Sequence, residues 1–275
     1  MLFADMSGKK IIKLMSLGAI FLLAWGIVEA RLLFLNREDM YSDDLPEVFS
    51  GYRVAFVTDI HAGIFFSIKR VDRLVEKINA ENPDLVILGG DYVFLGKNIV
   101  PELAQSLGHI QAPTVAVMGN HDNWEDPEGI RKEFNDNGIE VLDNDGKWIG
   151  RKEERIRIAG VDDWQTSVSL LGKSLNGVEI NDFTLLASHN PDVTYLLKED
   201  NRIDLILSGH THGGQISLFG LFSPLLPISH GQDYASGWVE NENFKLFVSR
   251  GVGDTILPLR FFAPPEWNII TLHRR

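Results

Sequence analysis

The stretch AFVTDIH at residues 55–61 joins a short apolar run to the polar residues Asp59 and His61. The same pattern, an apolar run that ends in polar side chains, recurs four times farther along the chain. The later copies are LVILGGD at 85–91, VAVMGNHD at 115–122, LLASH at 185–189 and LILSGHTH at 205–212. Runs of this length that are rich in valine, isoleucine and leucine predict strands buried on both faces of a sheet.

Helical periodicity separates the first two of these runs. Apolar residues recur at helical spacing, at Ile68, Val71, Leu74, Val75 and Ile78. Pro83 follows this stretch. This spacing predicts a helix over residues 68–82. Strands that alternate with helices indicate an α/β fold in which helices cover the sheet.

Polar residues with ligand atoms follow all five predicted strands. In open α/β sheets ligands bind beyond the carboxyl ends of the strands, so these side chains are expected to meet at one rim. One histidine alone is more often a surface or core residue, but five that follow strand ends are not a random scatter. The set is Asp59, His61, Asp91, Asn120, His121, Asp122, His189, His210 and His212, with glycines beside it at 89, 90, 119, 209, 213 and 214.

Composition bounds the remaining possibilities. The chain has 275 residues, of which 44% are hydrophobic, so disorder and collagen-like repeats are excluded. The net charge of −12 argues against broad binding to nucleic acid. Cysteine is absent, which excludes disulfides, thiolate nucleophiles and iron–sulfur clusters, so any metal must be held by oxygen and nitrogen.

The first 35 residues predict a membrane anchor or signal segment. Lys9, Lys10 and Lys13 precede an uncharged run over 14–28, and apolar residues resume at 32–35. At about 1.5 Å per residue this run falls short of the roughly 30 Å hydrocarbon core, so tilt or the second patch is needed to span it. An uncleaved anchor is favoured over a cleaved signal peptide and over a buried helix. The lysines favour a cytoplasmic amino terminus, but Arg31 and Arg37 leave the side of the membrane open.

Residues 36–50 are polar and acidic, carry one proline and predict a connector. The folded domain is expected to span residues 51–275.

The ordered blocks DIH, GGD, GNHD, SHNPD and GHTHGGQ resemble the calcineurin-like metallophosphoesterase superfamily from Tyr52 to the carboxyl terminus. The resemblance implies a two-sheet β-sandwich flanked by helices. It implies that Asp59, His61 and His212 bind one metal, that Asn120, His189 and His210 bind a second, and that Asp91 bridges them. It also implies that His121 is a catalytic residue facing the substrate phosphate.

One block departs from the protein-phosphatase branch of the superfamily. The second acidic residue that follows the GD block in that branch is replaced here by hydrophobic residues around Tyr92 to Leu95. A protein phosphatase is therefore less favoured. The partner of His121 stays open, with Asp122 as a candidate.

The resemblance implies hydrolysis of a phosphodiester or diphosphate bond. Two divalent metals about 3.5–4 Å apart turn a bridging water into an attacking hydroxide and relieve charge on the phosphoryl oxygens. Carboxylate, amide and imidazole ligands suit manganese, iron or zinc, and we predict manganese. A non-catalytic scaffold on the same fold is less favoured because the whole ligand set is present.

The narrower resemblance is to membrane-associated bacterial phosphodiesterases that include UDP-2,3-diacylglucosamine pyrophosphatases, and it is carried by VSRGVGDTILPLRFFAPPE at 248–266. It favours a lipid-linked substrate at a bacterial inner membrane; a broad phosphodiesterase of envelope polymers or nucleotides is the alternative. The stretch ISLFGLFSPLLPI at 216–228 is either an acyl-chain or membrane contact or a core strand with its cap. Arg250 and Arg260 are candidates to clamp substrate and Trp124 to stack on it, with surface solvation or packing as the alternatives.

Overall fold

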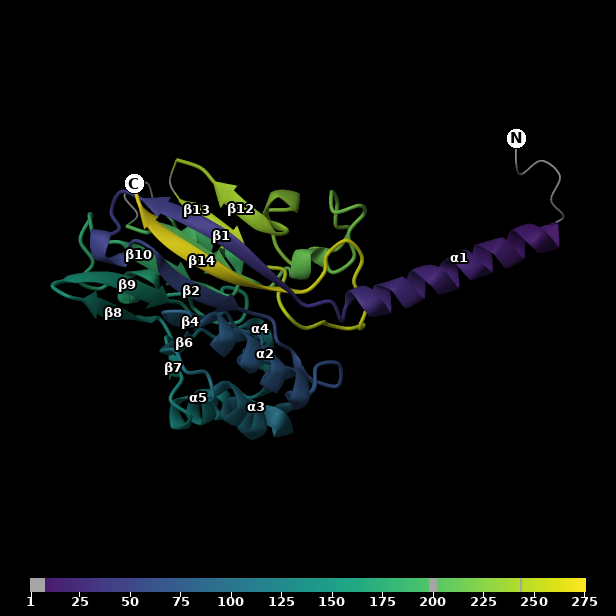
Figure 1. Ribbon diagram of the computed structural model, residues 1–275, viewed down its shortest axis with the longest axis horizontal. Coiled ribbons are helices and arrows are strands. Elements are labelled where there is room, and N and C mark those ends of the chain that lie inside the picture. Colours follow the sequence, from purple (N-terminus) through teal and green to yellow (C-terminus); the bar gives the residue numbers. More distant parts are fainter. Residues whose placement is uncertain (1–7, 198–201, 243) are drawn as a thin grey trace.

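Two six-stranded sheets form the centre of the molecule (Figure 1). The computed structural model describes residues 8–197, 202–242 and 244–275, so residues 1–7 of the expected anchor segment lie outside it. The first sheet has the order β1 (Phe34–Ser42), β14 (Glu266–Arg274), β2 (Tyr52–Val57), β4 (Leu85–Leu88), β6 (Thr114–Ala116) and β7 (Glu140–Val141). The second has the order β12 (Gly237–Glu240), β13 (Lys245–Val248), β11 (Leu205–Ser208), β10 (Thr184–Ala187), β9 (Glu154–Gly160) and β8 (Asp145–Arg151). A small third sheet pairs β3 (Ala62–Gly63) with β5 (Val93–Phe94).

The two sheets pack face to face, and the alternation of side chains along each strand supplies both cores. In β2, Val54 and Phe56 point into the core between the sheets, whereas Ala55 and Val57 point toward the helices. The central strands are therefore apolar at most positions, as expected for strands buried on both faces. β2, β4 and β6 run parallel, as do β9, β10, β11 and β13, so their carboxyl ends reach the same end of the sandwich.

Helices cover the outer face of the first sheet. They are α2 (Ile68–Glu81), α3 (Val100–Leu107) and α5 (Pro127–Asp136). α2 buries the four apolar residues Val71, Leu74, Val75 and Ile78, and it ends at Asn82, whose φ is 48°. The predicted helix over 68–82 is thus confirmed.

The outer face of the second sheet is covered by shorter elements. α6 (Leu171–Ser174) and the 3₁₀ turns η3 (Pro191–Leu196) and η5 (Gln232–Tyr234) lie there with the loops between them. The predicted two-sheet α/β fold is confirmed, and within the described residues the long helices of the domain lie on one outer face only. The remaining helical elements are α4 (Asn120–Glu125), η1 (Glu47–Phe49), η2 (Lys97–Ile99) and η4 (His212–Gly214).

The predicted connector over residues 36–50 is wrong for residues 36–42. These residues belong to β1, which pairs in parallel with β14 from Phe34↔Glu266 to Ser42↔Arg274. Charged residues such as Arg37 fit an edge strand because their side chains face water there, and Met40 is buried in the core. Leu45 and Phe49, later in the same stretch, are also fully buried, so the folded domain begins before residue 51.

The amino-terminal helix α1 (Gly8–Glu29) projects from the domain (Figure 1). Its 22 residues at about 1.5 Å each give a length near the roughly 30 Å thickness of a bilayer core. The helix is longer than the 15-residue uncharged run because it also includes Lys9, Lys10 and Lys13 at its start. Among the described residues it is the one helix long and apolar enough to cross a membrane, a property that signal sequences share.

Candidate functional site

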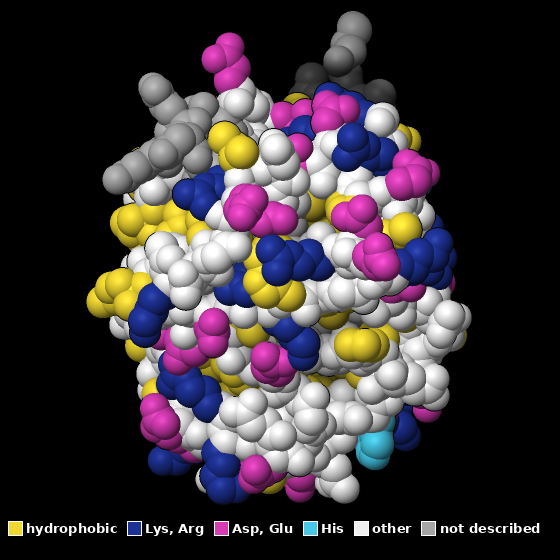
Figure 2. Space-filling view, turned by 90° about the vertical axis from the view of Figure 1, so that its left-hand side faces the viewer, with side chains coloured by type: hydrophobic (Ala, Val, Ile, Leu, Met, Phe, Trp, Pro, Cys, Tyr) yellow, Lys and Arg dark blue, Asp and Glu magenta, His cyan; other side chains and the backbone are white. Residues whose placement is uncertain are grey.

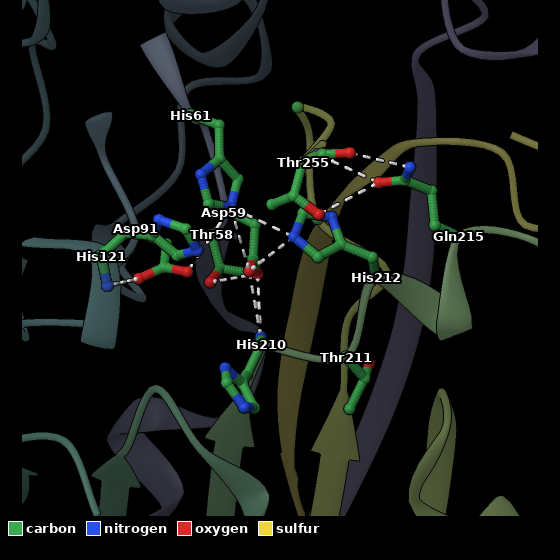
Figure 3. Close-up of polar contacts among 12 residues, drawn as sticks. Thr58, Asp59, His61, Asp91, His121, His210, Thr211, His212, Gln215 and Thr255 are labelled. Atoms are coloured by element: carbon green, nitrogen blue, oxygen red, sulfur yellow. Dashed lines mark hydrogen bonds and ion pairs between the residues drawn. The ribbon is translucent and has the colours of Figure 1, made fainter. Parts of the chain in front are cut away.

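The polar residues that follow the five predicted strands converge at one end of the sandwich, where both sheets contribute. β2, β4 and β6 lead to Asp59, His61, Asp91 and Asn120, and β10 and β11 lead to His189, His210 and His212. The facing ligand atoms of Asp59, His61 and His212 lie within 4.8 Å of one another, and so do those of Asp91, His189 and His210. In Figure 3 the side chains of Asp59, His61, Asp91 and His212 point toward a common centre.

Asp91 lies between these two groups. Its Oδ2 is 3.5 Å from Nε2 of His61 and 3.3 Å from Nε2 of His189. Its Oδ1 accepts the backbone N–H of His121 at 2.9 Å. One carboxylate oxygen therefore faces a histidine of each group.

The spacing of the ligand atoms fits metal coordination. Nε2 of His61 and Nε2 of His212 are 3.1 Å apart, and Nε2 of His189 is 3.2 Å from both Nδ1 of His210 and Oδ1 of Asn120. Two ligands at about 2.1 Å from one cation, and about 90–110° apart, lie roughly 3.0–3.4 Å from each other. The three pairs just named meet this condition, and so does the 3.4 Å between Nε2 of His212 and Oδ1 of Asp59, whereas Nε2 of His61 lies 3.9 Å from that same oxygen.

In two of the histidines, a hydrogen bond made by the outer ring nitrogen determines that the inner ring nitrogen carries the lone pair. Nδ1 of His189 donates to the carbonyl oxygen of Gly89 at 2.9 Å, and Nε2 of His210 donates to that of Pro227 at 3.0 Å. Since a carbonyl only accepts, the proton sits on these nitrogens, and each inner nitrogen presents a lone pair to the group. Such partners fix the tautomer and the orientation of metal-ligating imidazoles.

Burial keeps three of the imidazoles neutral. It lowers the pKa of His61 to about 3, and it also lowers the pKa of His210 and His212. His189 differs: burial alone would lower its pKa, but the carboxylate of Asp91 raises it well above its ordinary value. Burial opposes ionisation of Asp91, yet His189 and its hydrogen bond hold the pKa of Asp91 below its ordinary value. The centre therefore holds three neutral imidazoles around an ionised Asp91 carboxylate, and the raised pKa of His189 shows that positive charge is stabilised next to that carboxylate.

The local backbone is strained where it presents these side chains. Five of the seven candidate ligands have a positive φ, between 47° and 70°. They are Asp59, His61, Asp91, His210 and His212. Non-glycine residues adopt this conformation infrequently, and such strain clusters at functional sites. Gly119 and Gly209 make room for the ligands, because a Cβ on either would overlap the carboxylate of Asp91 or Asp59.

His121 is the second residue of α4, and it lines a cavity of about 680 Å³. The centre of its ring lies 4.9 Å from that of His61 and 5.0 Å from that of Trp124. In the part of the chain that the structure describes, the imidazole of His121 has no hydrogen-bond partner. Asp122 is not that partner: its buried carboxylate accepts the backbone N–H groups of Gly119, Asp91 and Tyr92.

The cavity has two chemically distinct parts. Its floor consists of Asp91, Asn120, His121, His210 and His212. Its wall is apolar and consists of Ile216, Leu225, Leu226, Ile256 and Leu257. The stretch 216–228 is thus not a core strand, because most of its large side chains are exposed beside the cavity.

The two arginines of the predicted substrate clamp, Arg250 and Arg260, both make contacts within the protein. Arg260 is fully buried: its guanidinium donates to Asp254 and to several backbone carbonyls, and it lies 3.1 Å from Nδ1 of His212. Arg250 pairs with Glu266, its Nε lying 2.9 Å from Oε2. Both cations are already engaged within the protein, and neither lines the cavity. Trp124 does line it and is 59% exposed.

An Asp–His pair beside the site was missed. His230 donates from Nδ1 to Asp192 at 2.7 Å, and its ring is stacked between Tyr195 and Tyr234 at 4.1 Å from each. Asp192 also accepts the N–H of Ser229, which holds the loop that carries the Pro227 carbonyl. Asp192 belongs to the SHNPD block and could have been identified from it. His230 follows no predicted strand, so no sequence pattern marked it as part of the site.

Comparison with known proteins agrees with the geometry. The family model described as "Calcineurin-like phosphoesterase" matches residues 52–214. The uncharacterized protein YpbG of Bacillus subtilis is 34% identical over 225 residues, which are 80% of each chain. The phosphodiesterase YaeI of Escherichia coli is 28% identical over 232 residues, which are 80% of this chain and 82% of that protein.

Solved structures support the fold. The NAD nucleotidase of Haemophilus influenzae superposes with a TM-score of 0.51 at 16% identity, over 73% of this chain and 45% of that one. The match to the family model and to YpbG establishes the relationship that the five strand-end blocks predict. The chain therefore belongs to the calcineurin-like phosphoesterase family and is a metallophosphoesterase.

Proposed function

We propose that this metallophosphoesterase hydrolyses phosphodiester or diphosphate bonds with two divalent cations held by seven side chains. One cation is assigned to Asp59, His61 and His212, and the other to Asn120, His189 and His210. Asp91 is assigned to both. The observation that carries the proposal is the position of Asp91 Oδ2, 3.5 Å from a nitrogen of one group and 3.3 Å from a nitrogen of the other.

Two bound cations supply positive charge to the phosphoryl oxygens and an activated water as nucleophile at neutral pH. The chain's own contribution is to fix the ligands before substrate arrives. The carbonyls of Gly89 and Pro227 hold the His189 and His210 rings, and the N–H of His121 holds the Asp91 carboxylate. Manganese is the proposed metal because the ligands combine carboxylate, amide and imidazole groups without thiolate.

His121 is proposed as the catalytic residue that contacts the substrate. It faces the cavity and has no partner for its imidazole among the described residues, so it is free to hydrogen-bond a phosphoryl oxygen or to protonate the leaving oxygen. Either role is typically worth 10²–10⁴-fold in rate. Trp124, whose ring lies 5.0 Å from that of His121, is proposed to pack against the group attached to the phosphate.

The proposed substrate class is an amphiphilic diphosphate such as a UDP-diacylglucosamine, bound by a protein anchored in a bacterial inner membrane. The apolar wall supports it, since Ile216, Leu225 and Ile256 rise directly from the floor that contains Asp91 and His121. An acyl chain buries more apolar surface against such a wall than a nucleotide or a polar polymer does.

The experiment compares three substrates with the purified full-length protein loaded with manganese. A bis-aryl phosphodiester tests for hydrolysis, and a chelator in a parallel reaction tests its metal dependence. UDP-diacylglucosamine and a UDP-sugar without acyl chains differ only in the apolar part. Metal-dependent cleavage with preference for the acylated diphosphate supports both parts of the proposal. Cleavage with equal rates on both diphosphates keeps the hydrolase and removes the lipid substrate in favour of a broad phosphodiesterase. No cleavage of any substrate removes both.

A further inference from the structure

Exposed apolar side chains gather on two loops beside the foot of α1. We call this surface the apolar rim and define it by Phe219, Leu221, Phe222, Leu225, Ile256 and Phe262. Leu221 is 84% exposed and Phe219 is 77% exposed. The two loops form one unit, because the N–H of Ser217 donates to the carbonyl of Phe261 at 2.9 Å and the N–H of Phe261 donates to that of Gln215 at 3.0 Å.

The apolar rim is fixed to the last turns of α1. The N–H of Arg260 donates to the carbonyl of Gly26 at 3.1 Å, and the N–H of Ala263 donates to Oε1 of Glu29 at 3.0 Å. A Cβ on Gly26 would lie 2.7 Å from the ring of Phe261, so only glycine allows this close packing. The rim therefore lies level with the end of a helix that is long and apolar enough to span a bilayer.

The backbone holds these side chains outward at an energetic cost. Phe219, Ile256 and Phe262 have φ values of 56°, 60° and 51°. Positive φ is a genuine outlier for a bulky or β-branched residue and costs of order 1–3 kcal/mol. Large exposed apolar patches of this kind mark interaction surfaces.

Charge separates the apolar rim from the rest of the surface. Residues 213–229 and 255–259 contain no Asp, Glu, Lys or Arg. Figure 2 shows the end of the molecule away from α1, where hydrophobic side chains are scattered among acidic and basic ones. Protein interfaces are bordered by polar residues, whereas this uncharged surface continues into a helix long enough to span a bilayer. The surface is therefore better suited to contact lipid than to contact another protein.

We infer that the apolar rim is an interfacial membrane-binding surface that enters the lipid bilayer beside α1 and seats the mouth of the cavity on the membrane. Leu225 and Ile256 belong both to the rim and to the cavity wall, so the cavity opens where the bilayer begins. The inference rests on the exposed loops and their contacts with α1, and it holds whether or not the proposed reaction is correct.

The test uses the absence of cysteine from the chain. Single-cysteine variants Phe219→Cys and Leu221→Cys carry a nitroxide label in the full-length protein, reconstituted in nanodiscs of phosphatidylethanolamine and phosphatidylglycerol. Neither residue lines the cavity. Ile180→Cys is the matched control, because Ile180 is 72% exposed and precedes β10 at the end of the sandwich opposite the site. A circular dichroism spectrum and a Tm equal to those of the wild type show that the labelled proteins are folded.

Collision rates of the label with oxygen and with a water-soluble nickel chelate give the result. A lipid-inserted label is expected to gain oxygen collisions and to lose nickel collisions by about fivefold or more relative to position 180. Equal nickel accessibility at all three positions overturns the inference because the rim then lies in water. Loss of both oxygen and nickel collisions at 219 and 221 also overturns it, since a protein surface then covers the rim.

Discussion

The floor and the wall of the cavity are built by opposite means. The floor side chains are almost all buried, and several are fixed by partners, such as the Pro227 carbonyl behind His210 or the His121 N–H on Asp91. The wall side chains come from two long loops and stay exposed, with Leu225 at 80% and Ile256 at 78%. This difference matches the proposed division of roles, in which groups fixed by the two sheets carry out the reaction and the loops select the substrate and contact the membrane.

The floor is expected to show the largest effect at Asp91. Asp91→Ala removes the one carboxylate that faces both groups, so elemental analysis is expected to give fewer than one ion per chain instead of two. Metal ions supply several kcal/mol of charge stabilisation, and 1.36 kcal/mol is tenfold in rate, so turnover is expected to fall by about 10³-fold or more. Asp136→Ala, at an exposed carboxylate on α5, is the control. A variant that keeps two ions per chain contradicts the bridging role.

His121→Ala separates chemistry from metal binding within the floor. The variant is expected to keep both ions and to lose about 10²–10⁴-fold in turnover, because the substrate loses a hydrogen-bond or proton donor. The measurements are kcat on an aryl phosphodiester and metal content of the same sample. His109→Ala, at an exposed histidine beyond the end of α3, is the control. Near-wild-type turnover removes His121 from the mechanism.

Arg260 contacts His212 in the floor and Asp254 in the loop that precedes Ile256 of the wall. Its replacement tests whether this loop contributes to metal binding by the floor. Arg260→Lys keeps the charge but loses the fork that reaches Asp254, His212 and the backbone carbonyls. Loss of a group that orients a metal ligand typically costs 10–100-fold in metal affinity, and the same is expected here. A competition titration with a metal-binding dye measures it, with Arg155→Lys as the exposed control. Unchanged affinity would show that His212 is held without Arg260.

The wall is expected to affect selectivity. Leu225→Ser removes apolar surface that an acyl chain buries, and burying one such side chain is worth about 1.5–3 kcal/mol. The ratio of kcat/KM for the acylated to the unacylated UDP-sugar is therefore expected to fall by about tenfold or more. Val168→Ser, at an apolar residue that is 66% exposed outside the cavity, is the control. If the ratio does not change, the cavity wall does not bind the acyl chain.

The smallest effect is expected outside the cavity, at the opposite ends of the same strands. Burial raises the pKa of Asp204 to about 6, although Ser42 and the N–H of Thr184 donate to its carboxylate. The folded state thus holds a proton that the unfolded state releases near pH 4. Stability from this group is complete below about pH 4 and is lost as the pH rises to about 6. As the pH rises from 4.5 to 7, the Tm of the Asp204→Asn variant is expected to decrease less than the Tm of the wild type. The metal content of the variant is expected to be unchanged. An equal decrease in both proteins removes Asp204 as the cause.

The strand-end ligands were predictable because their signal is local. An apolar run directly before Asp59 or Asp91 identifies both the strand and the end at which the ligand lies, and parallel pairing brings those ends together. The helix over 68–82 was predictable for the same reason, since its period and its stop at Pro83 lie within one short window.

The features that the sequence left undetermined depend on distant partners. β1 is a charged edge strand, and it is recognisable only through pairing with β14, more than 220 residues later. Arg260 was expected to reach substrate because an arginine near a site is compatible with either role. Its burial depends on Asp254 and on the loop carrying His212, whose packing no local pattern encodes.

The central claim is that one carboxylate, Asp91, joins two cation sites. Anomalous scattering from crystals of the full-length protein soaked in manganese tests it directly. The account predicts two anomalous peaks about 3.5–4 Å apart, one beside His61 and His212 and one beside His189 and His210, with Asp91 between them. A single peak, or two peaks that do not share Asp91, would contradict it.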